Sequence, residues 1–367
     1  EFSPALCLMA PSAMPAPATT GLALACAALI VLLRRALARE CALRQALEEA
    51  HRRKSKLGIE LMGVRNSLMH SPESLAAGRA LRTRPSDVFV VTYPKCGTTW
   101  MQQIVQGLRS GGSLDFGEIC EVMPWDILAI DCGQDLDAEQ PWQPRCFKSH
   151  EASDTIAAGA RYVYVARDPR DALVSFHKFL PSYCGLKTGD VSVEDFTDAI
   201  FAGASVSGQI WHHMLGWWRR RHSHDVLFVF YEDMREDLQR ETARVAEFMG
   251  VGRMGDELVA KAAHQATLAF MSADEHAHHF DDHFCRGALS RVMRLPPVPA
   301  GKSAASEVSK VNRGGGKSGY TITPDLVARL NAKWDDIVRP ETGLEDYAAM
   351  RREFRRERLE AAGSGPK

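Results

Sequence analysis

The sequence predicts an α/β fold: a single domain with a central parallel sheet flanked by helices and a P-loop-like phosphate-binding loop, preceded by an apolar N-terminal helix. From about residue 85, short apolar runs rich in β-branched and aromatic residues alternate with longer helical segments. This alternation is typical of a parallel sheet with helices on both faces. Before it, residues 21–33 form one continuous apolar run, which predicts the N-terminal helix.

Composition and charge limit the classes of function. The 367 residues suffice for one large domain or two small ones. The formal net charge of −1 excludes a general attraction to nucleic acid, so no nucleic-acid partner is expected. A site for an anion must therefore be local, made by a few lysines, arginines and backbone N–H groups.

The nine cysteines are scattered, without a CxxC pair or the spacing of a zinc site. This arrangement favours free thiols in a reducing compartment. A lumenal protein with one or two disulfides remains an alternative.

The first segment, residues 1–35, is predicted to be an anchor or a targeting segment. As a helix, its apolar core of 13 residues would be about 20 Å long, against the ~30 Å of a bilayer's hydrocarbon core. Arg34 and Arg35 follow it at once, and positive charge on this side predicts a cytosolic catalytic domain. We expect membrane association through residues 18–35. An organellar protein and a soluble cytoplasmic one remain alternatives.

The rest of the chain divides into a helical stalk at 36–75, a catalytic domain at 76–355 and a polar tail at 356–367. The stalk is interrupted at Ser71 and Pro72. The predicted strands are 88–91, 146–147, 162–165 and 226–230, and the predicted helices include 98–109, 171–179, 207–222 and 234–249. Ligands of such sheets bind at the carboxyl ends of the strands.

The strongest motif directly follows the first strand and runs from Thr92 to Trp100. Gly97 allows the backbone to approach an anion, and the first N–H groups of the next helix have no partner within that helix. Lys95 adds positive charge, while Thr98 and Thr99 add hydroxyl donors. The loop is therefore a predicted phosphate cradle. It is not a Walker A loop, because the lysine precedes the glycine.

Two further motifs follow other strands. Arg167 ends the third strand and Ser175 lies two turns into the next helix, so a guanidinium and a hydroxyl can reach one phosphate monoester. Taken alone, this segment could equally be a surface arginine and a helix-facing serine. Lys148 and His150 follow the second strand, where a histidine with an ordinary pKa near 6.5 can act as a general base. Alone, this pair is a weak signal.

Together the motifs resemble those of the cytosolic sulfotransferase family. Residues 92–100 are similar to the family's TYPKSGTTW loop for the 5′-phosphosulfate, with Cys96 in place of serine. Residues 167–175 are similar to its RxxxDxxVS segment for the 3′-phosphate, and Tyr231 begins a turn similar to its YEDM. At Cys96 a backbone N–H can still bind phosphate, but a hydroxyl donor is lost and a thiol is gained.

The resemblance implies a sulfotransferase that moves a sulfonate group from 3′-phosphoadenosine 5′-phosphosulfate (PAPS) to an acceptor hydroxyl or amine of a small molecule. It implies His150 as the general base, with Lys148 and Lys95 neutralising charge at the sulfonate and the leaving oxygen. The cofactor-binding residues that it implies are Lys95, Cys96, Gly97, Thr98, Thr99, Trp100, Arg167, Ser175, Tyr231, Arg313 and Gly314.

Arg313 and Gly314 belong to this set through a C-terminal segment, Lys310–Gly319, similar to the family's RKGxxGDWK loop. Arg313 and Gly314 match its Lys-Gly positions, whereas the Asp-Trp pair is missing. A plain flexible linker is the alternative interpretation.

Two other functions remain as alternatives: a nucleotide kinase, which the missing Gly-Lys-Ser/Thr loop disfavours, and a non-catalytic nucleotide-binding protein. No metal is expected in the reaction, and we interpret the histidine-rich segment 276–285, which ends in Cys285, as free of metal. Walls of the acceptor site are expected from three loops, 120–145, 180–205 and 273–295.

Overall fold

The computed structural model describes residues 19–251, 255–296, 310–311 and 322–363, and by contacts the chain separates into two units, Glu1–Arg53 and Lys54–Lys367. The elements of the second unit are α2 (Pro72–Arg79), β1 (Val88–Thr92), α3 (Thr98–Arg109), α4 (Ile119–Val122), η1 (Asp126–Leu128), η2 (Ile130–Cys132), β2 (Cys146–Ser149), β3 (Arg161–Ala166), α5 (Pro169–Tyr183), α6 (Val193–Phe201), α7 (Ile210–Arg219), β4 (Val226–Phe230), α8 (Tyr231–Glu236), α9 (Leu238–Met249), α10 (Asp256–Gln265), α11 (Leu268–Ser272), η4 (Ala277–Phe280), α12 (His283–Leu289), α13 (Pro324–Ile337), α14 (Arg339–Thr342) and α15 (Tyr347–Gly363).

The described residues of the first unit belong to the N-terminal part of one long helix, α1 (Thr19–Ser67). Every described side chain of this unit from Leu24 to Arg53 is exposed, including the large apolar ones. The helix continues across residue 35, the predicted boundary between the anchor and the stalk, because leucine, alanine, arginine and glutamate favour helix on both sides of it. None of the helices in the described residues combines the length and apolarity that a bilayer crossing requires.

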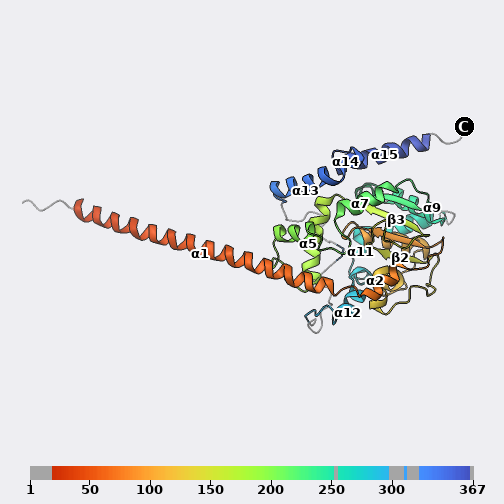
Figure 1. Cartoon of the computed structure of the whole chain (residues 1–367), viewed down its shortest axis with the longest axis horizontal. Coiled ribbons are helices and arrows are strands. Elements are labelled where there is room, and N and C mark those ends of the chain that lie inside the picture. Colours follow the sequence, from red (N-terminus) through yellow and green to blue (C-terminus); the bar gives the residue numbers. More distant parts are fainter. Residues whose placement is uncertain (1–18, 252–254, 297–309, 312–321, 364–367) are drawn as a thin grey trace, which may run out of the picture. The chain divides into compact units, whose positions relative to one another are not determined.

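The sheet has four parallel strands in the order β2-β1-β3-β4 (Figure 1). All five residues of β1 are buried, as expected of a central strand with helices on both faces. Successive side chains alternate between two clusters. Val88 and Val90 pack with α3, α9 and α10, whereas Phe89 and Val91 share a cluster with α7 and the C-terminal helix. The predicted α/β class is confirmed.

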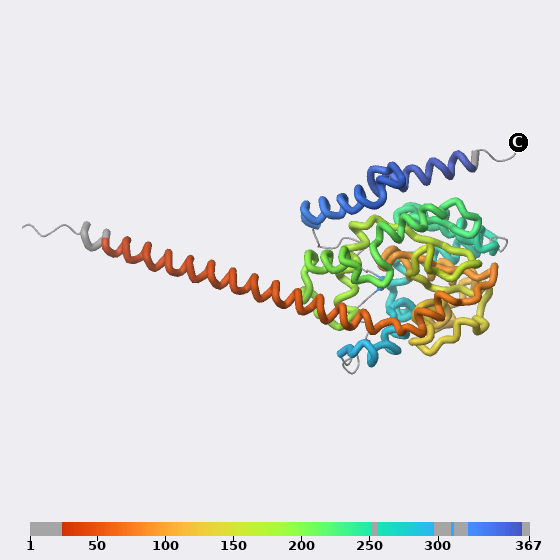
Figure 2. The backbone as a smooth tube through the Cα atoms, viewed as in Figure 1, coloured from red at the N-terminus to blue at the C-terminus, as the bar shows by residue number. Residues whose placement is uncertain are grey.

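The C-terminal helix α15, dark blue in Figure 2, lies along the outside of the second unit. Phe354 of this helix contacts Phe228 and Phe230 of β4, with ring centroids 5.5 and 5.8 Å apart. Arg351 and Arg355 pair with the buried Asp233 at the start of α8. The helix continues to residue 363, across the predicted start of a polar tail at 356.

A buried ion pair lies at the amino ends of β1 and β2. The Arg145 Nη2 atom is 2.6 Å from the Asp87 Oδ2 atom, and the two side chains are 1% and 0% exposed. Arg145 also donates to the carbonyl oxygen of Leu136, so the loop before β2 depends on the same guanidinium. Removing one charge of such a pair leaves the other buried without compensation.

We therefore expect Asp87→Asn to lower the free energy of unfolding by about 3–5 kcal/mol, the usual cost of breaking a buried ion pair. Denaturant unfolding followed by fluorescence measures this change. The control is Glu341→Gln, which removes an exposed pair with Arg219 and should leave the unfolding free energy unchanged. Equal stability of the two variants would contradict a structural role for the buried pair.

Candidate active site

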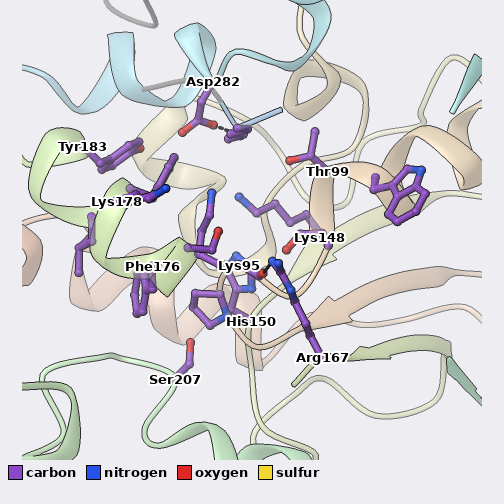
Figure 3. Close-up of a pocket in the computed structure, with 18 of the residues that line it drawn as sticks. Lys95, Thr99, Lys148, His150, Arg167, Phe176, Lys178, Tyr183, Ser207 and Asp282 are labelled. Atoms are coloured by element: carbon purple, nitrogen blue, oxygen red, sulfur yellow. Dashed lines mark hydrogen bonds and ion pairs between the residues drawn. The ribbon is translucent and has the colours of Figure 1, made fainter. Parts of the chain in front are cut away.

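A cavity of about 910 Å³ opens at the carboxyl ends of the strands (Figure 3). Each predicted motif contributes residues to its lining. The lining includes Lys95, Gly97, Thr98, Thr99, Trp100, Lys148, His150, Arg167, Ser175 and Tyr231. Of the predicted site residues, Cys96 does not line the cavity, and Arg313 and Gly314 lie outside the described residues.

The loop between β1 and α3 has the backbone of an anion cradle. Lys95 and Gly97 both have positive φ, 69° and 106°, which turns the chain sharply into the first turn of α3. A Cβ atom at Gly97 would lie 2.8 Å from the Tyr231 ring, so only glycine fits here. The Thr92 and Thr98 hydroxyls are 2.6 Å apart, which ties the strand end to the helix start.

Cys96 turns its side chain into the core beneath this loop. The residue is 1% exposed, and burial raises the pKa of its thiol to about 12. A thiol with so high a pKa is a poor nucleophile near neutral pH. The backbone N–H of Cys96 donates to the carbonyl oxygen of Tyr93 at 3.1 Å, so this residue supports the turn of the loop.

His150 is oriented by the neighbouring strand. Its Nδ1 atom lies 2.7 Å from the carbonyl oxygen of Thr92, which can only accept a hydrogen bond. The proton is therefore on Nδ1, and Nε2 has a free lone pair. Burial, followed by the charge of Lys148, holds the pKa of His150 well below its usual value, so the imidazole is neutral near pH 7.

Two lysines bring positive charge to the cavity without a carboxylate partner among the described residues. The Lys95 Nζ atom lies 3.7 Å from the centre of the Phe179 ring, and Lys148 Nζ lies 3.5 Å from that of Trp125. Aromatic faces attract an ammonium without neutralising it, so both remain available to an anion. Figure 3 shows both side chains pointing into the middle of the cavity.

The pKa of Lys95 is lowered to about 7, first by burial and then by the charges of Lys310 and Arg167. Near neutral pH a large share of Lys95 is therefore neutral in the free protein. An anion bound at this lysine would favour the ammonium form and raise its pKa.

Arg167 is held in place by the loop between β1 and α3 and by the first residue of α8. Its Nη1 atom donates to the carbonyl oxygen of Lys95 at 2.8 Å, and its guanidinium lies 4.3 Å from the centre of the Tyr231 ring. Its Nε atom is buried and has no hydrogen-bond partner in the described structure. An unpaired buried donor on a cation is costly, and an anionic ligand would satisfy it.

Trp100 and Tyr231 form an aromatic edge of the cavity. Their ring centroids are 5.2 Å apart in an edge-to-face arrangement, and the Trp100 indole N–H donates to the carbonyl oxygen of Ala266 at 2.7 Å. Glu232 accepts a hydrogen bond from the Tyr347 hydroxyl at 2.6 Å and does not line the cavity. This carboxylate shapes the turn after β4.

Comparison with known proteins assigns the chain to a family. The family described as "Sulfotransferase domain" matches residues 85–287, more than half of the chain. The chain belongs to the sulfotransferase domain family. It is 30% identical to mouse sulfotransferase 2B1 over 215 residues. The matched region covers 56% of this chain and 62% of the mouse protein. It is 26% identical to dog sulfotransferase 1B1 over 272 residues, and this match covers 71% of this chain and 84% of the dog protein.

Solved structures share the sulfotransferase fold. A retinol dehydratase in complex with androsterone and the inactive cofactor PAP superposes with a TM-score of 0.52 at 21% identity, over 74% of this chain and 87% of that one. Mouse sulfotransferase SULT7A1 complexed with PAP gives a TM-score of 0.52 at 20% identity, over 75% and 91%. At these identities the likeness concerns the fold.

The described residues fit the PAPS donor of this family. PAPS supplies an activated sulfonate and carries two phosphate groups. The unpaired Nε atom of Arg167 and the glycine cradle at residue 97 suit a phosphate-bearing ligand. Lys95 and Lys148 supply ammonium groups that lie against aromatic rings and not against carboxylates.

Several lining residues were not predicted individually. The face of α5 presents Phe176, Phe179, Leu180 and Tyr183, spaced three and four residues apart, a helical pattern visible in the sequence. Trp125, Ser205 and Asp282 line the cavity from the three loops expected to form its walls. His70 precedes α2 and also lines the cavity, and its isolated position in the sequence gave no signal.

The low pKa of Lys95 predicts that nucleotide binding takes up a proton. Above pH 7, binding of the polyanion adenosine 3′,5′-bisphosphate (PAP) must first protonate Lys95, so its affinity should fall up to about tenfold per pH unit. At pH 8 the uptake should approach one proton, as measured by titration calorimetry in buffers of different ionisation enthalpy.

Lys95→Arg is the matched variant, because an arginine keeps the charge but stays protonated. The variant should bind PAP with little proton uptake. Equal uptake by the wild-type chain and by this variant would assign the proton to another group.

Proposed function

We propose that this chain transfers a sulfonate group from PAPS to a hydroxyl or amine of a small acceptor, with His150 as the general base. The observation that supports this most is the tautomer of His150. Because Nδ1 donates to the carbonyl oxygen of Thr92, Nε2 can accept the acceptor's proton. The neutral state of the buried imidazole near pH 7 supports the same role.

We assign the remaining roles by position. Lys95 and Lys148 hold the sulfonate end through their ammonium groups, and the cradle around Gly97 holds the 5′-phosphate. Arg167 and Ser175 bind the 3′-phosphate, supported by the unpaired donor on Arg167. Fixed charges in a cavity shielded from water stabilise developing negative charge more than water does.

The acceptor is proposed to have an apolar body. The cavity lining includes Phe176, Phe179, Tyr183, Trp125 and Met271, and the Phe179 and Trp125 rings lie beside the two lysines. Aromatic walls of this kind favour a flat or alicyclic molecule over a highly charged one. The relatives bound to androsterone and to retinol are consistent with such an acceptor.

The base assignment predicts a loss of turnover without a loss of binding. His150→Ala should lower kcat by about a hundredfold or more, the scale of a general base, with PAP affinity changed only a few-fold. Because the pKa of His150 is lowered, the wild-type rate should be retained below pH 6.5 and lost only when the imidazole is protonated. Steady-state kinetics and calorimetry measure the two effects.

Two variants sharpen this test. His150→Asn keeps a donor for the Thr92 carbonyl oxygen but provides no base, so it should be as inactive as the alanine variant. His264→Ala alters an exposed histidine outside the cavity lining and should be fully active. Near-wild-type turnover of His150→Asn would remove the base assignment, whereas a wild-type chain that binds PAP without turnover would favour the non-catalytic alternative.

We further propose that residues 18–35 associate with a membrane or a partner. The supporting observation is the run of exposed apolar side chains from Leu29 to Leu33, since such a surface is rarely left in water. Deleting residues 1–35 should preserve activity and move the protein from the membrane fraction to the supernatant. An inactive or insoluble truncation beside a soluble full chain would instead make the segment a structural helix.

A further inference from the structure

A compact group of four possible metal ligands lies beside the cavity. Glu118 and Cys120 belong to the start of α4, and Asp282 and Cys285 belong to the start of α12. One ligand atom from each side chain lies within 4.8 Å of the other three, and all four residues are buried. Asp282 also lines the cavity (Figure 3).

One buried oxygen atom of this group lacks a hydrogen-bond partner among the described residues. The Glu118 and Asp282 side chains are 0% and 3% exposed. In the described part of the chain, Lys310 is the one cation within ion-pairing distance of either carboxylate. It forms a hydrogen bond with Asp282 and is 3.8 Å from Glu118 Oε1. That Oε1 atom is buried and has no hydrogen-bond partner among the described residues. A buried oxygen without a hydrogen-bond partner is costly, and a ligand at this position would satisfy it.

The surrounding groups suit a metal with sulfur ligands. Gln102 Nε2 lies 3.8 Å from Cys120 Sγ, as an outer-shell donor to a thiolate would. The Glu118 Oε2 atom accepts from the backbone N–H of Cys120 at 3.2 Å, which fixes that carboxylate and leaves Oε1 for a ligand. Two sulfurs with two carboxylate oxygens favour Zn²⁺ over Mg²⁺ or Ca²⁺, which prefer oxygen alone.

We propose that Glu118, Cys120, Asp282 and Cys285 bind one Zn²⁺ ion. Tetrahedral zinc with bonds of about 2.0–2.3 Å places its ligands roughly 3.3–3.8 Å apart, so the four atoms need only a small contraction. Each thiol releases a proton when it binds the ion. The ion joins α4 to α12 and thereby fixes two of the loops that form the acceptor cavity. Because no step of sulfonate transfer passes through it, its role is structural.

The adjacent histidines do not belong to this site. His279 Nδ1 lies 3.0 Å from the carbonyl oxygen of Gly117, and His283 Nδ1 lies 2.6 Å from Asp281 Oδ1. Cys285 joins Cys120, which is distant in sequence, rather than the histidines of its own segment. The proposed site is therefore different from a histidine site at 276–283.

Cobalt substitution tests the proposal directly. The full chain, reduced and stripped of metal with a chelator, should bind one equivalent of Co²⁺ with the near-ultraviolet absorption of thiolate-to-cobalt charge transfer, and Zn²⁺ should remove that absorption. Cys120→Ser and Cys285→Ser should each weaken the band and lower the affinity at least about tenfold, the scale of even an outer-shell change. Glu118→Gln should weaken binding without abolishing the band.

Controls separate this site from others. Cys184→Ser changes a buried thiol outside the group, and the double variant His276→Ala/His278→Ala removes histidines of the neighbouring segment; both should bind Co²⁺ like the wild type. Lys310→Met should bind more tightly, because the ammonium no longer competes for Asp282. If a serine variant does not fold, zinc should still raise the unfolding temperature of the wild type and of Cys184→Ser alike.

Three results would overturn the proposal. The first is the absence of a thiolate band at stoichiometric Co²⁺ in the wild-type chain. The second is a band that survives in both serine variants. The third is a Cys120–Cys285 disulfide, found by mass spectrometry in the chain purified under reducing conditions, which would make the group a redox pair.

Discussion

The parallel register of four short strands is the constraint on which the site depends. Val91 of the central strand pairs with Ser149 of β2 and with Tyr164 of β3, so the three strands end at nearly the same level. The residues that follow them, His150, Arg167 and the phosphate loop, therefore meet at one edge. Since side chains alternate between the faces, a shift of one residue would turn each strand's core residues toward the wrong face. Core packing and site geometry are thus fixed together.

Burial of positive charge is the second organising feature. The cavity holds Lys95, Lys148 and Arg167 against aromatic rings rather than against carboxylates. A carboxylate beside each would stabilise the free protein but would compete with an anionic ligand. Aromatic faces keep the cations in place at a smaller cost in ligand affinity. Asp282, which also lines the cavity, is instead paired with Lys310, and Glu118 Oε1 lies 3.8 Å from the same ammonium.

Much of this site was predictable because its motifs are local. Each directly follows a buried apolar run, and parallel strands bring such positions together without further information. The strand at 146–147 was underestimated, since β2 extends to Ser149 and carries Lys148 within it. Lys148 and Ser149 in the second half of β2 interrupt the apolar run from which the strand was predicted. Lys148 is nevertheless 4% exposed, because its stem is buried and its ammonium lies over Trp125.

The remaining features depend on contacts between distant parts of the chain. Asp126 lies in a stretch rich in aspartates, yet it is 1% exposed and accepts from the backbone N–H of Ile127 at 2.7 Å. Cys120 and Cys285 meet only because α4 and α12 pack together at the cavity wall. No periodicity links such residues, so the spacing rules that find zinc ligands close in sequence could not detect them.

Burial beside other cations lowers the pKa of both His150 and Lys95, but the consequences for the two side chains differ. The lowered pKa of His150 leaves the imidazole neutral, which is the state that a base requires before any ligand arrives. The same environment lowers the pKa of Lys95 to about 7, which partly removes the charge that an anion requires. Only the anion itself reverses this loss, because its charge offsets both the desolvation and the repulsion from Arg167 and Lys310. The proposed base is therefore neutral in the free protein, whereas the positive charge of Lys95 would be restored only by an anionic ligand.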